Sequence, residues 1–435
     1  MVLLRDRQFR AFWSGALISN VGTWMQNVSV PYALYRTTGE ARWVGIAAVA
    51  QFLPSLVAGP LGGALADRID RKRFLFISQL LQCAIAAAMW LSWTTGAASP
   101  TVLVTLLALN GVVYGGTAPC WQAFVGELAP KGTLVSAITL NSAQLNAARA
   151  VGPALAGIVI AEWGAGTAFL VNALSYSGVI VALLLIRTSF APDSSPTTPM
   201  WQALRSGARF VATQSHLRAA VLTALVTAVL LAPLQQFLAV VADEVGATTP
   251  RWYGAMTATY GFGASFGAVA LAVVGSRLRS STVLRVSLPF YAALVLLLSR
   301  AQAGWHCLVV LPFAGAATVS VFAVLNTAVQ RGAPAALRGR VLSIYLGAHS
   351  IGIPLGSWLQ GVSADRFGVD DTLAVAALGH LAFTAAFGRR LLDRIDRGVL
   401  GPPSATTDPG LPPSEPLAAP PAVPPTSKEH DAPVR

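Results

Sequence analysis

The sequence predicts an all-α membrane protein whose chain crosses the bilayer twelve times, and three observations support this prediction. The 435 residues are 54% hydrophobic and only 11% charged, with a mean hydropathy of +0.60, whereas about a quarter of the residues in soluble domains are charged. Apolar runs of about 20 residues, long enough to span a bilayer as helices, recur between Phe9 and Phe387. The glycine and proline spacing also repeats between the two halves of the chain.

The apolar runs fix the order of the elements. A transmembrane barrel would show alternating segments of about ten residues, so we expect helices throughout. The first run lacks a small-residue cleavage site, which predicts a retained anchor and not a removed signal. The predicted spans cover about residues 11–35, 43–66, 74–95, 101–125, 136–161, 167–187, 217–241, 252–275, 282–300, 305–329, 340–363 and 371–390.

Positive charges predict the orientation of these spans. With a cytoplasmic N-terminus, 22 of the 30 basic residues fall on the cytoplasmic side and five on the outer side, and only Arg149 fits neither a loop nor a tail. Because cytoplasmic loops are enriched in Lys and Arg, we expect a multi-pass protein of the cytoplasmic (plasma) membrane with both termini inside. The net charge of +12 therefore reflects topology and does not indicate binding to nucleic acid.

An internal repeat divides the chain into two six-helix halves. A shift of 204 residues superimposes Gly63 on Gly267, Gly111 on Gly315, Pro130 on Pro334, Gly152 on Gly356, Gly157 on Gly361 and Gly164 on Gly368. Parallel repeats of this kind are one known plan for transporters that bind substrate between the halves. We expect bundles at residues 1–187 and 217–395. A cytoplasmic linker with an interfacial helix lies at 188–216, and a disordered Pro-rich tail at 396–435.

The most distinctive local pattern is "GGALADRIDRKRF", from Gly62 to Phe74, at the turn between the second and third spans. Gly63 is expected to allow close helix approach, and Asp67 lies at the membrane edge beside Arg68, Arg71 and Lys72. A positive cytoplasmic loop explains the basic residues, but not the Gly-x-x-x-Asp-Arg spacing.

This loop resembles the signature loop of the major facilitator superfamily, apart from Asp70, where many members have glycine. "GPALAG", with Gly152, Pro153 and Gly157, resembles a motif of drug:proton antiporters. Three longer stretches, residues 9–39, 141–157 and 326–356, resemble the enterobactin-exporter-like branch, which includes multidrug exporters. The resemblance covers about residues 5–395 and implies the two-bundle fold of that superfamily.

The resemblance also implies an inner gate. Asp67 is expected to face Arg338 and Arg340 at the start of the eleventh span, where a helix N-terminus stabilises a carboxylate. Glu127 is either a partner of Arg71 or a solvated loop acid. Such pairs would favour the outward-open state and break when the transporter opens inward.

Arg149 lies inside the fifth predicted span, about 20 Å from its cytoplasmic start. An arginine at this depth costs at least ~2.5 kcal/mol, so it should face the protein interior and have a partner. Two interpretations remain open: a structural bridge to an amide such as Asn110, Asn141, Gln144 or Asn146, or contact with an anionic substrate.

Further polar residues are candidates for a transport cavity or for contacts between helices. The cavity candidates are Trp24, Gln26, Asn110, Tyr114, Asn146, Arg149, Gln235, Asn326 and His349. For the coupling proton, the candidates are His349, Asp243, Glu244 and Glu162. Cys83, Cys120 and Cys307 are too dispersed for a metal site, and we expect no cofactor.

These features predict a secondary transporter, not an enzyme, that exports drug-like or siderophore-like small molecules in exchange for protons. We expect a monomer in the lipid bilayer. Two alternatives remain: an importer or symporter on the same fold, and a non-transporting membrane sensor or assembly protein. No nucleotide-binding loop is present in the sequence, so ATP is not expected to be the direct energy source.

Overall fold

Helices form all the regular secondary structure in the described part of the chain. The computed structural model describes residues 3–66, 69–130, 132–186, 200–274, 279–334 and 337–400. A short 3-10 turn, Leu3–Arg5, precedes the first long helix. The all-α fold predicted from the sequence is confirmed.

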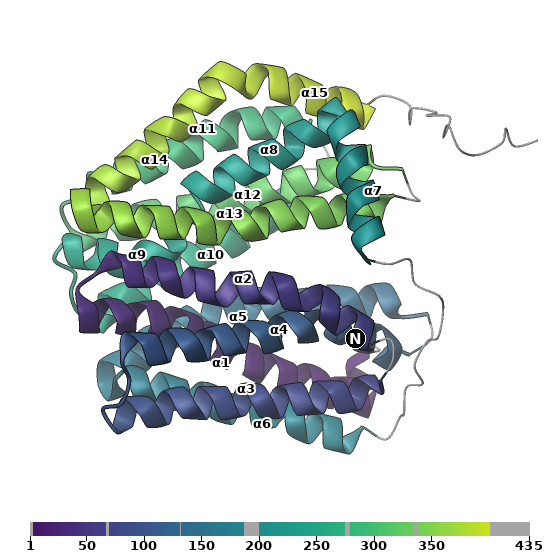
Figure 1. Cartoon of the computed structure of the whole chain (residues 1–435), viewed down its shortest axis with the longest axis vertical. Helices are drawn as coiled ribbons and strands as arrows, with labels where there is room; N and C mark the ends of the chain where they lie inside the picture. The colour runs from purple at the N-terminus through teal and green to yellow at the C-terminus, as the bar shows by residue number, and fades with distance from the viewer. Residues whose placement is uncertain are drawn as a thin grey trace, which may run out of the picture. The chain divides into compact units, whose positions relative to one another are not determined.

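Six long helices form the first half of the molecule (Figure 1). They are α1 (Arg7–Thr38), α2 (Ala41–Ala66), α3 (Arg71–Thr94), α4 (Pro100–Leu128), α5 (Leu134–Trp163) and α6 (Ala165–Leu185). Helix α1 packs against α5 and α6, α2 against α4, and α3 against α4 and α6.

The second half repeats this plan. It contains α8 (Ser215–Leu230), α9 (Leu234–Glu244), α10 (Pro250–Val274), α11 (Ser280–Leu298), α12 (Gly304–Gly332), α13 (Arg338–Phe367), α14 (Val369–Phe383) and α15 (Arg389–Leu400). Helices α8 and α9 together form one span, as do α14 and α15, which join through a π-helical turn at Thr384–Gly388. Helix α10 packs against α12, α11 against α12 and α14, and α13 against α8.

Ten spans among the described residues are long and apolar enough to cross a membrane. Helices α1 and α13, with 32 and 30 residues, are equally long but more polar, and they complete the predicted set of twelve. The two halves meet where α2 packs against α13 and α5 against α10.

The repeat seen in the sequence corresponds to equivalent contacts between the halves. Gly157 of α5 lies so close to Gly254 of α10 that a methyl group at either position would overlap the other backbone. Its repeat partner, Gly361 of α13, lies against the backbone of Ala41 and Arg42 in α2, where an added Cβ would lie 3.0 Å from the Ala41 carbonyl oxygen. Glycine thus allows close approach of the helix backbones at both junctions between the halves.

One glycine does not have its predicted role. Gly63 was expected to allow close helix approach, but a Cβ there would lie 3.8 Å from the nearest atom, on Pro119, which is an ordinary contact. The close approach is instead at Gly62, where a Cβ would overlap the Gly116 backbone of α4. Adjacent residues on a helix point about 100° apart, so only one of the two can face α4.

The seventh span, predicted from the sequence as one run at residues 217–241, is broken. Residues 231–233 form a turn between α8 and α9, and this turn ends at Pro233, whose ring fixes φ and removes a backbone donor. Carbonyl groups at the break accept hydrogen bonds from side chains: Gln360 Nε2 donates to Val229 and Leu230 at 3.1 and 2.9 Å, and Tyr291 Oη donates to Leu231 at 2.9 Å. Side chains of α11 and α13 therefore satisfy backbone groups that lipid cannot.

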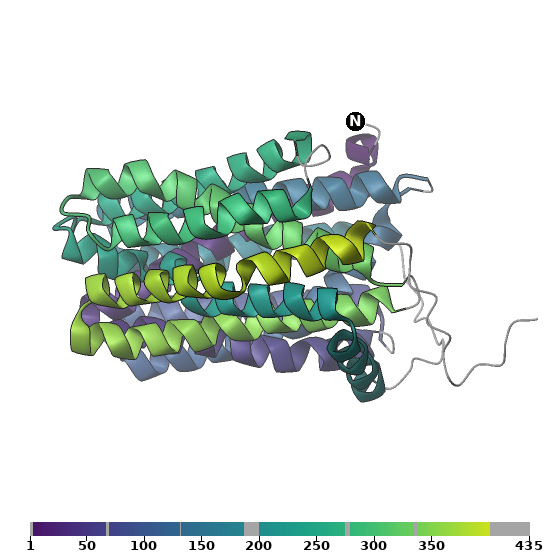
Figure 2. The ribbon, with the colours of Figure 1, turned by 90° about the horizontal axis from the view of Figure 1, so that it is seen from above.

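Helix α7 (Met200–Thr213) lies between the two halves in sequence, as predicted for the linker. It packs against the start of α13, where Gly207 touches the backbone of Arg340. In both ribbon views α7 and the N-terminus lie at one end of the molecule, and the turn between α13 and α14 lies at the other (Figures 1 and 2). We call these the N-terminal end and the far end.

Candidate functional site

Arg149 lies between the two halves and is surrounded by aromatic residues from both. Its guanidinium carbon is 5.0 Å from the centroid of the Trp24 ring in α1, within the range of a cation–π interaction. Tyr114 of α4 and Tyr260 of α10 lie near enough to influence its charge electrostatically. Although it is near the middle of α5, Arg149 is exposed, so it borders accessible space.

His349 of α13 is a further electrostatic neighbour of Arg149. Its ring lies edge-on against Phe322, with centroids 4.2 Å apart, and its Nδ1 has no hydrogen-bond partner among the described residues. Five helices, α1, α4, α5, α10 and α13, thus converge on one charged side chain.

The predicted cavity residues separate into two groups. Trp24, Tyr114, Arg149 and His349 come together, with Asn146 exposed one turn before Arg149. The other four predicted cavity residues are not among the neighbours of Arg149 described above. Gln26 accepts a 2.7 Å hydrogen bond from Asn172, and Asn326 accepts one from Gln330. Asn110 is buried in α4, and Gln235 follows the break in the seventh span.

Two of the four amides proposed as partners of Arg149, Asn141 and Gln144, form hydrogen bonds with other side chains. Gln144 Nε2 donates to Asn141 Oδ1 at 3.0 Å, and the same oxygen faces Trp121 Nε1 at 3.4 Å. The neighbours of the guanidinium that the structure identifies are the ring side chains of Trp24, Tyr114, Tyr260 and His349. Tyr260 was not among the predicted site residues, because it stands in an apolar run with other aromatic residues such as Tyr253, Phe262 and Phe266, and nothing in the local sequence distinguishes it from them.

The signature loop is described in part. Asp67 and Arg68 lie outside the described residues. Arg71 forms an ion pair with Glu127, and its side chain is only 12% exposed. Lys72 Nζ donates to the carbonyl of Ile186 at 2.5 Å, which ties the start of α3 to the end of α6.

Two further features complete the N-terminal end. Asp70 caps α3 by accepting from the backbone amide of Arg73 at 2.8 Å. Arg340 Nη1 donates to Ser206 of α7 at 3.1 Å, so the linker helix is joined to the start of α13.

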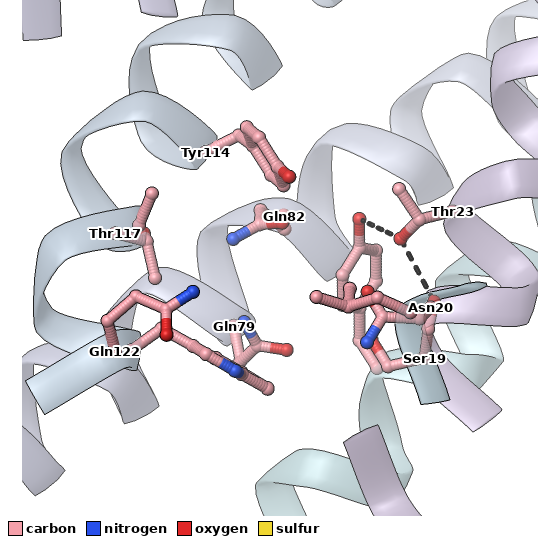
Figure 3. A pocket seen from close by; sticks show the side chains of 12 residues that line it. Ser19, Asn20, Thr23, Gln79, Gln82, Tyr114, Thr117 and Gln122 are labelled. Atoms are coloured by element: carbon pink, nitrogen blue, oxygen red, sulfur yellow. Dashed lines mark hydrogen bonds between the residues drawn. The ribbon is translucent and has the colours of Figure 1, made fainter. Parts of the chain in front are cut away.

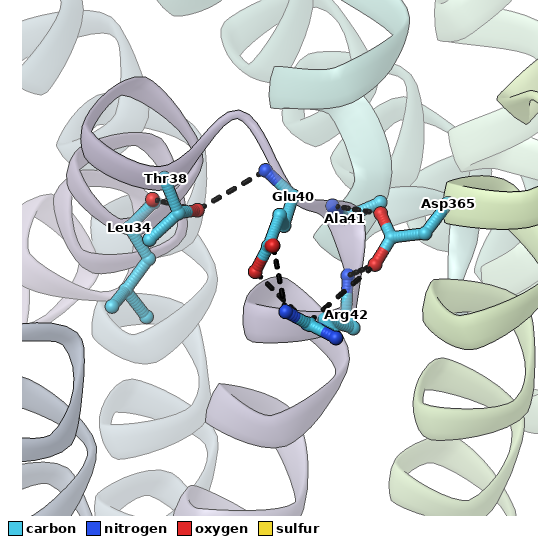
Figure 4. Close-up of polar contacts among 6 residues, drawn as sticks. All are labelled: Leu34, Thr38, Glu40, Ala41, Arg42 and Asp365. Carbon is cyan, nitrogen blue, oxygen red and sulfur yellow. Dashed lines mark hydrogen bonds and ion pairs between the residues drawn. The ribbon is translucent and has the colours of Figure 1, made fainter.

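At the far end, Asp365 connects the two halves (Figure 4). Its carboxylate at the end of α13 accepts from the backbone amides of Ala41 and Arg42 at 2.6 and 3.1 Å. These amides begin α2, where unpaired N–H groups and the helix dipole favour a negative charge. The Arg42 side chain lies 4.0 Å from Asp365 and forms a two-point contact with Glu40.

Two other ion pairs cross the far end. Arg36 of α1 faces Asp243 of α9 at 3.5 Å, and Tyr35 Oη donates to the same carboxylate at 3.4 Å. Arg251 of α10 pairs with Glu162 of α5. Two candidate proton carriers, Asp243 and Glu162, therefore belong to contacts between the halves, while Glu244 is exposed.

An aromatic contact also crosses the junction. Tyr253 of α10 donates to the Val28 carbonyl of α1 at 2.9 Å, and its ring stacks on Tyr32 with centroids 5.2 Å apart. The described side-chain hydrogen bonds and ion pairs between the membrane-spanning helices of the two halves lie on the far-end side of Arg149. We call this set of contacts the far-end clamp.

Comparison with known proteins places the chain in a family. Residues 2–409 match the family model described as "Transmembrane secretion effector". The chain is 24% identical over 385 residues to the staphyloferrin A transporter of Staphylococcus aureus (86% of this chain, 94% of the relative). It is 27% identical over 377 residues to the multidrug efflux pump Tap of Mycolicibacterium fortuitum (84% and 91%).

Solved structures show the same fold. The nucleoside transporter NupG superimposes with a TM-score of 0.74 at 12% identity, covering 88% of this chain and 98% of that one. A bacterial homologue of the lysosomal transporter Spinster, in an inward-facing and unoccupied conformation, gives a TM-score of 0.62 at 17% identity, with 91% and 92% coverage. The family is not enzymatic. The chain belongs to the transmembrane secretion effector family and is a membrane transporter of the major facilitator superfamily.

Proposed function

We propose that this transporter exports small organic molecules carrying an anionic group, in exchange for protons. Arg149 carries the proposal. No carboxylate in the described part of the chain forms an ion pair with it, although a charge at this depth costs at least ~2.5 kcal/mol. Because aromatic rings from both halves surround Arg149, an amphipathic anion would gain both an ionic and an apolar contact.

The direction of transport rests on similarity. Gly152, Pro153 and Gly157 match the antiporter motif, and relatives include proteins named as efflux pumps. Gly152 lies against Trp24 of α1 within the first half, whereas Gly157 lies at the α5–α10 junction, where contacts change as the halves rock. This placement supports a role for the motif in alternating access.

We infer that the N-terminal end is cytoplasmic and that the far-end clamp seals the outer side. In the inward-facing state the clamp is closed, and substrate reaches Arg149 from the cytoplasm. Opening outward requires the clamp to break, and Asp67 is proposed to meet the start of α13 near Arg338 and Arg340 in that state. The Arg71–Glu127 pair joins α3 to α4 within the first half and is formed while the far-end clamp is closed, so, contrary to expectation, it is not a pair that breaks on inward opening; its proposed role is to hold the start of α3 in place.

The proton carrier is proposed to be His349. It neighbours Arg149, and its ring nitrogen Nδ1 has no described partner, so it can take part in exchange between substrate and proton. Replacement of His349 by Gln should abolish uptake driven by a pH gradient but retain downhill exchange of substrate across the membrane. Loss of both activities would argue for a structural role instead.

The function can be tested in everted membrane vesicles with an imposed pH gradient. Carboxyfluorescein supplies an anionic probe and ethidium a cationic comparison. We expect gradient-dependent accumulation of carboxyfluorescein that Arg149→Ala abolishes and Arg149→Lys partly retains. If Arg149→Ala keeps full activity, the charge has no role in transport.

The same assay separates the alternatives. An importer would accumulate the probe in right-side-out vesicles and not in everted ones. A sensor or assembly protein would move no compound in either orientation. The cost of keeping Arg149 in the membrane favours a transporter over a protein that needs only the fold.

A further inference from the structure

A polar cavity of about 100 Å³ is lined by residues of the first half alone and lies beside Arg149. Twelve residues from α1, α3, α4, α5 and α6 line it (Figure 3). A site needs roughly 10–15 Å³ to hold one water molecule, so this cavity accommodates several waters or one polar arm of a ligand.

The lining is rich in hydrogen-bonding groups and lacks charge. Of the described residues that line the cavity, none is Asp, Glu, Lys or Arg. The polar members are Ser19, Asn20, Thr23, Gln79, Gln82, Tyr114, Thr117, Trp121, Gln122 and Tyr176. This composition suits a neutral ligand group with several hydroxyls, because amides both donate and accept and aromatic rings cover apolar faces.

Gln79 indicates that a partner is missing. Its side chain is 3% exposed and points toward the cavity, and its Oε1 atom has no hydrogen-bond partner among the described residues (Figure 3). A buried oxygen without a donor costs about 1–3 kcal/mol. By contrast, the Thr117 and Thr23 hydroxyls already donate to the backbone carbonyls of Val113 and Ser19.

The cavity adjoins the Arg149 site. Tyr114 lines the cavity and is also an electrostatic neighbour of Arg149. Leu145, another lining residue, precedes Arg149 by four positions and therefore lies on the same face of α5. A single molecule can thus place one group against Arg149 and another in the cavity.

We propose that this cavity binds an uncharged, hydroxyl-rich arm of the transported molecule, such as a sugar ring, while Arg149 holds its anionic group. The proposal rests on the proposed function, because it assumes that the anion binds at Arg149. It adds a second recognition element, with the Gln79 carbonyl accepting from a ligand hydroxyl.

Two probes that differ in their hydroxyl groups test this proposal. 4-Nitrophenyl β-D-glucuronide has an aromatic ring, a carboxylate and several hydroxyls, whereas 4-(4-nitrophenoxy)butanoate has the ring and carboxylate alone. Binding is measured by calorimetry on the full chain in nanodiscs. We expect the wild type to bind the glucuronide about tenfold more tightly, equivalent to one or two added hydrogen bonds.

Variants test which residues cause the preference for the glucuronide. Gln79→Leu should weaken glucuronide binding about fivefold to tenfold and leave butanoate binding unchanged. Gln122→Leu, at an exposed lining position where misfolding is not expected, should weaken the glucuronide less but in the same selective way. Gln302→Leu, the same chemical change in an exposed loop at the far end, should affect neither probe.

The outcomes distinguish the two proposals. Equal binding of both probes by the wild type, no glucuronide binding, or equal weakening of both probes by Gln79→Leu and Gln122→Leu would overturn the cavity assignment. If Arg149→Ala leaves both affinities unchanged while Gln79→Leu remains selective, the cavity stands and the anion site fails.

Discussion

The two halves have the same helix arrangement but differ in how polar their buried side chains are. The buried positions of α3 and α11 coincide when α3 is shifted by 209 residues, the separation between Arg71 and Ser280, where the two helices begin. Under this shift Gln79 corresponds to Leu288 and Gln82 to Tyr291. Under the 204-residue shift that relates α5 to α13, Arg149 corresponds to Ile353.

Side-chain contacts between the first and last spans are present in both halves. Thr23 Oγ1 lies 3.4 Å from Tyr176 Oη, and Thr227 Oγ1 lies 3.0 Å from His380 Nε2, in each case joining the first and last spans of a half. The cavity and the arginine are not needed for this packing, because the second half forms it without them. Under the proposed function, the first half supplies the charge of Arg149 and the polar cavity, and the second half adds Tyr260 and His349 beside that charge.

The largest expected effect is the loss of transport when Arg149 is replaced. Arg149→Ala should lower the initial rate of carboxyfluorescein transport about 10- to 100-fold, because a hydrogen bond to a charged group is worth about 1.5–3 kcal/mol. Ile353→Ala, at the corresponding position of the second half, should retain activity within about twofold. Rates are measured in proteoliposomes with equal amounts of inserted protein. Similar losses in both variants would remove the asymmetry between the halves.

The second effect concerns stability in the second half. Gln360→Leu removes the donor to two carbonyl groups at the broken span, which should destabilise the protein by about 1–3 kcal/mol. The midpoint of thermal unfolding in detergent should fall, while Gln302→Leu should leave it unchanged. An unaltered midpoint for Gln360→Leu would mean that water replaces the side chain at the break.

The sequence predicted the order of the helices well because the patterns that indicate helices are local or periodic. Apolar runs, loop charges and repeated glycines sufficed for twelve helices in two halves, and the loop charges left Arg149 as the one misplaced cation. Gly157, one of the repeated glycines, lies against Gly254 of α10, where the two halves meet.

Contacts between distant helices were harder to predict. The assignment of close approach to Gly63 and not Gly62 failed because it depends on how α2 is rotated toward α4. Asp365 was not among the predicted site residues, since its partners, the amides of Ala41 and Arg42, lie 324 and 323 positions away. The polar cavity was missed because its residues come from five helices and no single segment contains a pattern.

The two equivalent glycine junctions should respond differently to alanine. Gly157→Ala would place a methyl group into the backbone of Gly254, whereas Gly361→Ala would leave about 3.0 Å to the nearest atoms of Ala41 and Arg42. We therefore expect Gly157→Ala to shift the protein further toward the outward-open state. Spin labels at Thr95→Cys and Arg300→Cys, exposed positions at the far ends of the two halves, report the shift as a longer distance. Equal shifts would show that the junctions are mechanically equivalent.

The smallest effects are expected from the far-end clamp, where two carboxylates can be compared. Asp243 faces Arg36 at 3.5 Å on an exposed surface, and such pairs contribute less than about 1 kcal/mol. Asp365 accepts two backbone hydrogen bonds at a helix N-terminus, an arrangement that favours the ionised carboxylate more strongly. Asp365→Asn should therefore increase the population of the long spin-label distance more than Asp243→Asn does, and high salt should reduce the effect of Asp243→Asn more. The reverse order would mean that the surface pair, and not the capped helix, holds the far end closed.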